Sequence, residues 1–170
     1  MRRIWKGGGI RMDESIFERP LEDQLCFEVY RAANGFGKMY NRALKDFHLT
    51  FPQYLVLLAL WDEDNILIKH IGERLGMGIG TLNPILNRLE KQGWITKEPS
   101  LLDKRATIVT LSEKGITSKK AINLAILSEV NACSLEGIDG LLLMKQLKIL
   151  NKSMGGIDQN SLKNKNKGVE

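Results

Sequence analysis

The sequence predicts a mainly α-helical fold that carries one small β-hairpin. Apolar residues recur every three or four positions through most of residues 20–154, which is the spacing of amphipathic helices. Only residues 94–98 and 106–111 alternate apolar and polar side chains, as the two strands of a hairpin do. Because two short helices are expected directly before this hairpin, the element order is that of a winged helix-turn-helix.

Length and composition limit the class of protein. The 170 residues suffice for one compact domain with oligomerisation segments, and an apolar content of 43% supports a hydrophobic core. The longest apolar run, Tyr54–Trp61, is far shorter than the roughly 20 residues that span a bilayer, so no membrane segment is expected. The basic start lacks the apolar core of a secretion signal. With two cysteines, we expect a cytoplasmic protein in which any disulfide is regulatory rather than structural.

The net charge of +5 comes mainly from the two ends of the chain. Residues 1–11 hold four basic residues and no acidic one, and residues 160–170 hold three lysines and one glutamate. Residues 12–159 are therefore close to neutral, at about −1. The overall charge consequently does not predict DNA binding, and the local placement of cations has to decide.

Both ends also differ in composition from the middle of the chain. Residues 1–19 are expected to be an N-terminal extension, and residues 156–170 a flexible polar tail. One hypothesis is that Met12 is the native start, because a purine-rich ribosome-binding site, if translated, gives residues such as Lys6–Gly9.

Residues 20–49 are predicted to be a dimerisation and sensor segment built on one long helix. Pro20 suits a helix start, and apolar residues recur at helical spacing over about Leu21–Asp46. Gly35 and Gly37 weaken the middle of this helix and allow a bend or a close helix contact there.

Residues 50–111 are predicted to be the DNA-binding domain. Thr50 and Gln53 match a capping box at the start of its first helix. Pro84 is expected in the first turn of its third helix, where a missing N–H is tolerated. The three helices are expected over residues 51–61, 68–75 and 80–92.

Residues 112–155 are predicted to form C-terminal dimerisation helices. Ser112 is the expected cap of a helix that runs to Ala132. Ser134 is the expected cap of a last helix, which runs to about Met154.

The third helix of the DNA-binding domain is predicted to have two chemically different faces. Leu82, Ile85, Leu86 and Leu89 share the apolar face. The opposite face offers hydrogen-bond donors and cations that suit a major groove. Its candidate DNA-binding residues are Thr81, Asn83, Pro84, Asn87, Arg88 and Lys91. An ordinary solvated helix face is the alternative interpretation.

The tip of the hairpin carries Asp103, Lys104 and Arg105, which are further candidate DNA-binding residues. A basic side chain there could reach the minor groove beside the reading helix. Asp103 stands two residues before Arg105, so its carboxylate is expected to brace the guanidinium as an ion pair. Taken alone, these residues are better explained by a plain polar turn.

The run DKRATIVTLSEKG resembles the wing signature of MarR-family regulators, D-x-R-x-x-x-V-x-L-[ST]-x-x-G, from Asp103 to Gly115. The runs LTFPQYLVLLALW and IGERLGMGIGTLNPILNRLEKQGWI are similar to this family too, over about residues 20–152. The resemblance implies a transcription regulator, expected to be a repressor, that binds double-stranded DNA. It also implies an intertwined homodimer on a pseudo-palindromic operator whose half-sites lie about one DNA turn apart.

The dimer also follows from the residues themselves. The apolar faces of the segments Leu21–Phe47 and Leu135–Met154 need a partner that one short domain does not fully provide.

Near its start, LCFEVY resembles the organic-hydroperoxide-sensing OhrR branch of this family and its thiol-sensing relatives, which implies that Cys26 is the reactive group. Tyr30 lies one turn further along the same helix face, so its hydroxyl can stabilise the thiolate. Tyr40 stands at nearly the same angle but roughly 21 Å along the helix, so it would serve the partner subunit's thiol. The expected signal is an organic hydroperoxide or another thiol oxidant.

Two positions depart from that branch. Phe51 stands in LTFPQY where such sensors tend to have a third tyrosine, so a hydroxyl donor is missing and a lower reactivity is expected. Gly78 and Ile79 stand where relatives tend to have Asp-Ser, which leaves the base preference open.

The role of Cys133 has two interpretations. By resemblance to two-cysteine members of the branch, it is a possible resolving cysteine that captures the sulfenic acid of Cys26 as an intersubunit disulfide. Equally, it is a small buried residue, in which case a low-molecular-weight thiol would cap Cys26.

Other functions remain as alternatives. A MarR-type regulator released by a phenolic or apolar ligand would use Cys26 only as a pocket wall. A thiol peroxidase is disfavoured because the sequence has no C-x-x-C pair, cofactor motif or metal-ligand cluster, so neither an enzyme nor a cofactor is expected. A winged helix that binds only protein would lack salt-dependent DNA affinity. His48 and His70 are isolated and receive no role.

Overall fold

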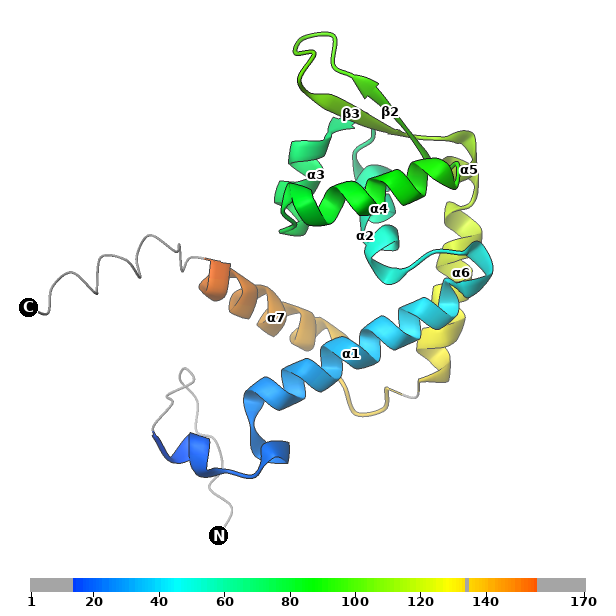
Figure 1. Cartoon of the computed structure of the whole chain (residues 1–170). Coiled ribbons are helices and arrows are strands. Elements are labelled where there is room, and N and C mark those ends of the chain that lie inside the picture. The colour runs from blue at the N-terminus through cyan, green and yellow to red at the C-terminus, as the bar shows by residue number, and fades with distance from the viewer. Residues whose placement is uncertain (1–13, 134, 156–170) are drawn as a thin grey trace, which may run out of the picture. The chain divides into compact units, whose positions relative to one another are not determined.

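The computed structural model describes residues 14–133 and 135–155 (Figure 1). They belong to two separate units, one ending at Ala132 and one beginning at Cys133. The proposed start at Met12, the proposed cap Ser134 and the tail of residues 156–170 lie outside the described residues.

The predicted mainly helical fold with a small wing is confirmed. In chain order the first unit contains η1 (Glu14–Glu18), η2 (Leu21–Asp23), α1 (Leu25–Ala43), η3 (Lys45–Phe47), α2 (Phe51–Asp62), β1 (Ile66–Leu67), α3 (Ile68–Leu75), α4 (Ile79–Lys91), β2 (Ile95–Pro99), β3 (Thr107–Leu111), α5 (Glu113–Thr117) and α6 (Lys119–Ala132). The second unit contains α7 (Gly140–Gly155). Among these helices, none is long and apolar enough to cross a membrane.

The long N-terminal helix begins later than predicted. Residues Leu21–Asp23 form only a 3-10 turn, and the extended backbone of Gln24 separates that turn from α1. The two glycines in the middle, Gly35 and Gly37, do not interrupt the helix, and a Cβ on either would meet nothing within 4 Å.

Side-chain caps tie α2 to its neighbours. The predicted capping box is confirmed, because the Thr50 N–H donates to Gln53 Oε1 at 2.8 Å and the Thr50 side chain faces the start of the helix. Asn41 of α1 accepts a hydrogen bond from the Phe51 N–H at 2.9 Å. The start of α2 is therefore held by a residue of α1 as well as by its own box.

The sheet contains one strand that the sequence did not predict. Two-residue β1 pairs antiparallel with β3, which also pairs with β2, so the strand order is β1-β3-β2. Asn65 adopts a left-handed backbone conformation (φ 57°) directly before β1. The Leu111 N–H donates to Asp64 Oδ1 at 2.9 Å, which fixes the end of β3 beside this turn.

Helix boundaries after α2 differ from prediction as well. Because α4 begins at Ile79, Pro84 lies in its second turn, where it removes the bond to the carbonyl of Gly80. The expected single helix after Ser112 is divided at Ser118 into α5 and α6, although the Ser112 cap itself is confirmed at 3.1 Å.

The last helix, α7, begins at Gly140 rather than near Ser134. Its cap is Asp139, whose Oδ1 accepts the N–H groups of Leu141 and Leu142, both at 3.0 Å.

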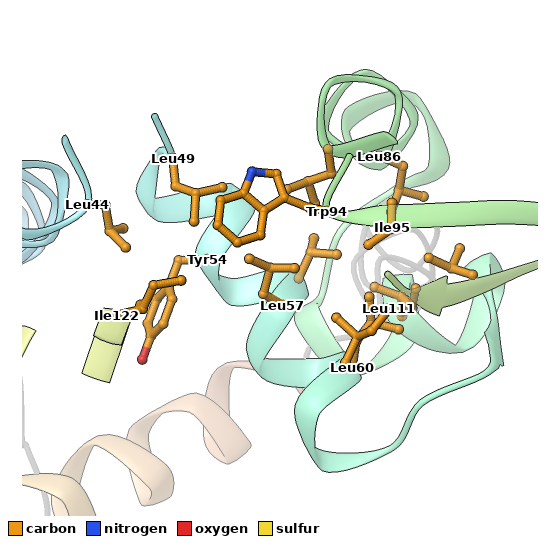
Figure 2. Packing of buried hydrophobic residues seen from close by; sticks show 14 of the residues in the cluster. Leu44, Leu49, Tyr54, Leu57, Leu60, Leu86, Trp94, Ile95, Leu111 and Ile122 are labelled. Carbon is orange, nitrogen blue, oxygen red and sulfur yellow. The ribbon is translucent and has the colours of Figure 1, made fainter. Parts of the chain in front are cut away.

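The core of the first unit lies between α2, α4, the sheet and α6 (Figure 2). Its centre is Trp94, which is 1% exposed and stands between α4 and β2. Other buried members, from different elements, are Leu44, Leu57, Leu60, Leu86, Ile95, Leu111 and Ile122.

The tightest backbone approach in this core is at Gly115 of α5. A Cβ added at Gly115 would lie 2.5 Å from the carbonyl oxygen of Trp94. The carbonyl of Gly115 in turn accepts the indole N–H of Trp61 at 2.9 Å. Only glycine fits this position without moving α5 away from the Trp94 backbone.

We therefore expect Gly115→Ala to lower the free energy of unfolding by about 1–3 kcal/mol, because the extra methyl forces backbone to shift. Urea unfolding followed by far-UV circular dichroism measures the change. Gly80→Ala is the matched control, since a Cβ at Gly80 meets nothing within 4 Å and helical alanine is favoured over glycine. Equal stability of the two variants would contradict the steric argument.

Candidate functional site

The two-faced character predicted for α4 is confirmed by burial. Leu82, Leu86 and Leu89 are at most 1% exposed and pack into the core, and Ile85 is partly buried against it. The predicted DNA-binding side chains of α4 are all exposed: Thr81, Asn83, Pro84, Asn87, Arg88 and Lys91. The helix therefore presents one continuous polar surface away from the core, although their contact with DNA stays a prediction.

Lys97 of β2 connects the hairpin to this polar face. Its Nζ donates to Asn87 Oδ1 at 2.6 Å and pairs with Glu90 at 2.8 Å. Because the acceptor of Asn87 is occupied, the free hydrogen-bonding capacity of its side chain is the two N–H donors. The contacts of Lys97 with Asn87 and Glu90 also hold the hairpin against α4.

The tip of the hairpin, drawn beyond α3 and α4 in Figure 1, is a hydrogen-bonded turn. Asp103 was expected to pair with the Arg105 guanidinium, but its Oδ1 instead accepts the backbone N–H of Arg105 at 2.9 Å. A carboxylate two residues before a donor closes an Asx turn more readily than it reaches a long side chain. Lys104 and Arg105 are exposed, as a contact with DNA requires.

Cys26 lies closer to a helix start than the sequence suggested. It is the second residue of α1, so its backbone N–H is among the four that have no acceptor within the helix. The thiol is exposed in the single chain, and so is Tyr30, at 64%, one turn further along.

Tyr40, near the other end of α1, belongs to a row of aromatic rings. Its ring stacks on Phe51 with centroids 4.6 Å apart and on Tyr54 at 5.6 Å. Tyr54 continues the row to Trp61 at 6.0 Å. Burial, and secondarily the neighbouring Tyr40, raises the pKa of Tyr54 above its ordinary value of 10.0, so the phenol stays a neutral donor.

Cys133 directly follows α6 and is half-buried. It belongs to the second unit, whereas Cys26 belongs to the first. In the part of the chain that the structure describes, no group of three or more His, Cys, Asp or Glu side chains could hold a metal ion.

Comparison with known proteins decides the family. Residues 38–122, half of the chain, match the family model described as "Transcriptional regulator SarA/Rot". The chain belongs to this SarA/Rot family of regulators. The SarA/Rot regulators have a MarR-like winged-helix fold, so the resemblance seen in the wing signature is confirmed. The chain is therefore a DNA-binding winged-helix transcription regulator.

Individual relatives agree with this assignment. The "Organic hydroperoxide resistance transcriptional regulator" of Bacillus subtilis (strain 168) is 38% identical over 114 residues, which cover 66% of this chain and 78% of that protein. The regulator TtmR of Methylorubrum extorquens (strain PA1) is 46% identical over 95 residues, 56% of this chain and 49% of TtmR. The chain thus spans about half the length of TtmR.

A solved structure of a DNA-bound protein, AbfR, is similar over most of the chain. Reduced AbfR of Staphylococcus epidermidis bound to DNA is 35% identical, with a TM-score of 0.67 over 79% of this chain and 94% of that chain. The two curated relatives are named as transcription regulators, and AbfR was solved bound to DNA.

Sequence reasoning missed two side chains of this SarA/Rot regulator's candidate sites. Lys97 shares the face of buried Ile95 in an alternating strand, and a cation at such an inward position could have signalled a partner. Tyr54 lies in an almost wholly apolar helix with no amphipathic pattern, so no periodicity pointed to its position beside Tyr40.

For the reading face, we expect Arg88→Ala to weaken operator binding about tenfold or more, because a guanidinium that reads a guanine contributes about 1–3 kcal/mol. Fluorescence anisotropy with the DNA upstream of the chain's own gene measures the affinity. Lys38→Ala is the control, since Lys38 is an exposed cation on α1 outside the proposed DNA face. Equal affinities of the two variants would remove Arg88 from the interface.

Proposed function

We propose that the chain is a redox-controlled repressor whose reduced homodimer binds its operator and releases it when an organic hydroperoxide oxidises Cys26. The observation that carries the proposal is an exposed thiol at the second position of a helix, one turn before an exposed tyrosine. The name of the Bacillus subtilis relative supports the type of signal. The AbfR structures, one reduced on DNA and one with a disulfide formed, support control by thiol oxidation.

The homodimer is proposed because long apolar faces are left uncovered in the single chain. On α1 and just before it, Leu21, Leu25, Val29 and Phe36 are between 41% and 57% exposed. On α7, Leu141, Met144 and Ile149 are between 51% and 80% exposed. A second copy that interlocks the segments 20–49 and 112–155 of both chains buries these faces, leaving residues 50–111 as the DNA-binding domain.

On DNA, the dimer is proposed to place one α4 in each of two successive major grooves. The exposed donors of α4, from Thr81 to Lys91, then face base edges and phosphates. The two hairpin tips, with Lys104 and Arg105, lie over the flanking minor grooves. Such an arrangement requires a pseudo-palindromic operator with half-sites about one helical turn apart.

The oxidation step is a displacement at oxygen. The Cys26 thiolate attacks the terminal oxygen of the hydroperoxide, the O–O bond breaks, and the alkoxide leaves and takes a proton to become an alcohol. Cys26 is then a sulfenic acid, oxidised by two electrons. A second thiol, from Cys133 of the partner or from a small molecule, displaces water and forms a disulfide.

Polarisation of the thiol is assigned to two tyrosines. Tyr30 is one turn from Cys26 on α1, whereas Tyr40 is 14 positions away, or roughly 21 Å along the same helix. Tyr40 can therefore serve only the partner subunit's thiol, and the proposed sensor is complete only in the dimer.

Release follows from the geometry of two half-sites. A disulfide or mixed disulfide at Cys26 moves the helices that set the spacing of the two reading helices. Because both half-sites must be occupied at once, a shift of a few ångströms between them is enough to lose the second contact.

The test is a gel shift on the DNA upstream of the chain's own gene, with and without cumene hydroperoxide. We expect wild type to release the DNA, Cys26→Ser to bind and remain bound, and Cys133→Ser to release without an intersubunit disulfide, as seen on non-reducing gels. Release of the Cys26→Ser protein by hydroperoxide would reject the redox proposal.

The aromatic row adds a prediction about rate. Phe51 stacks on Tyr40, so Phe51→Tyr places a new hydroxyl beside the proposed polarising phenol. We expect Cys26 to react with hydroperoxide several-fold faster in this variant, because an added donor stabilises the thiolate. Stopped-flow oxidation measures the rate, and Phe51→Leu, which adds no donor, is the control. An unchanged rate in Phe51→Tyr would place position 51 outside the sensor site.

The second candidate function is release by a small apolar or phenolic ligand. It is favoured by an open groove of about 410 Å³ along α5 and α6, where Ile116, Leu124 and Leu127 stand beside Lys119 and Lys120. The same gel shift separates the two functions, since ligand release does not depend on Cys26.

A further inference from the structure

Two leucines at the hairpin tip are almost wholly exposed. Leu101 is 99% and Leu102 100% exposed, more than any other large apolar side chain in the described residues. Single exposed leucines are common on protein surfaces. Two adjacent ones at the end of a projecting element are a concentrated apolar surface in contact with water.

The loop that carries them is built by hydrogen bonds. The N–H of buried Ser100 donates to the carbonyl of Ala106 at 2.8 Å, and the N–H of Leu102 donates to Ser100 Oγ at 3.3 Å. Asp103 accepts the N–H of Ala106 at its carbonyl and that of Arg105 at its carboxylate. The backbone is therefore folded back on itself while both leucine side chains stay outside.

The chemistry around the pair favours nucleic acid as the occupant. Lys104 and Arg105 are exposed directly after the leucines, and the carboxylate of Asp103 is engaged with the backbone. Cations that flank an apolar tip match a minor groove, where phosphates line the rims and apolar wedges enter between base steps.

The hairpin is also long enough to reach the DNA backbone beside the groove that α4 occupies. Lys97 holds β2 against Asn87 and Glu90 of α4, so the hairpin moves with the reading helix. Leu101 is four residues beyond Lys97, or about 13 Å along an extended strand. A major groove is about 12 Å wide, so the tip extends past the groove occupied by α4 to the next backbone.

We infer that Leu101 and Leu102 are an apolar wedge that enters the minor groove beside each half-site and partly unstacks one base step. The inference rests on the proposed placement of α4 and the hairpin on DNA. The wing then makes an apolar contact with DNA and prefers pyrimidine–purine steps, which unstack easily. Its charged residues alone would recognise only phosphates and groove width.

The experiment uses the reduced full chain and a duplex selected in vitro from a random library. 2-Aminopurine is placed at each flanking step, because its fluorescence rises when a base unstacks. We expect a fluorescence increase at one step per half-site. Replacing both leucines with alanine should abolish the increase and weaken binding about tenfold, with an unchanged salt dependence.

Two controls identify the apolar contribution. Leu101→Met with Leu102→Met keeps the apolar surface and should keep the fluorescence increase. Lys104→Ala should lower the slope of log affinity against log salt by about 1 and keep the increase.

The outcomes separate the two proposals. If wild type selects no duplex, the DNA placement and the wedge both fail. If the alanine pair binds like wild type with the same fluorescence, the wedge alone fails. If the alanine pair changes only the oligomeric state in sedimentation, the leucines bind a second copy of the chain, and the wedge is again rejected.

Discussion

The close approach of α5 to the backbone of Trp94 is the constraint on which the arrangement of the first unit depends. Gly115 admits this approach, and the Ser112 N–H donates to the same Trp94 carbonyl at 3.0 Å. Lys114, between them, lies 4.2 Å above the Trp94 ring and donates to the carbonyl of Gln92. The cap residue Ser112 and two residues of α5, Lys114 and Gly115, thus contact the end of α4 and the start of β2. Helix α6 begins directly after this junction.

The same junction connects the reading helix to the beginning of α2. Gln92, the residue that caps the C-terminal end of α4, donates to the carbonyl of His48 at 3.1 Å. The buried Gln53 donates to Gln92 Oε1 at 3.4 Å. Gln53 also closes the capping box of α2. The α1–α2 connection is therefore joined to the end of α4 by side-chain amides as well as by the apolar core, to which Leu44 and Leu49 belong.

The proposed sensor and the proposed DNA-binding surface have different physical requirements. The thiol needs donors and solvent access, which an exposed first helical turn provides, whereas specific DNA contact needs a rigid reading face. The aromatic row begins at Tyr40, which stacks on both Phe51 and Tyr54, and continues from Tyr54 to Trp61. The Trp61 indole N–H donates to the carbonyl of Gly115 at the core junction. In the proposed dimer, the partner's thiol would lie at the outer end of this row.

By itself the sequence determined the features that depend on neighbours along the chain. The capping box of Thr50, the Ser112 cap, the two faces of α4 and the strands of the wing all follow from residues one to four positions apart, and each is present in the structure. The wing signature, which lies within the single stretch Asp103–Gly115, predicted the winged-helix family that the comparison then showed. The candidate DNA face of α4 could be predicted from the sequence for the same reason, since helical periodicity separates its buried residues from its exposed ones.

Only the tertiary structure decided the features that join residues far apart in sequence. Strand β1 is too short to show alternation and exists because β3 offers it a partner more than 40 positions away. Lys97 on Asn87, Phe51 on Tyr40 and Tyr54 beside them are contacts between different elements, which no periodic pattern contains. The start of α1 at Leu25, which brings Cys26 into the first helical turn, is likewise set by the extended backbone of Gln24, because propensity alone allows the helix to begin at Leu21.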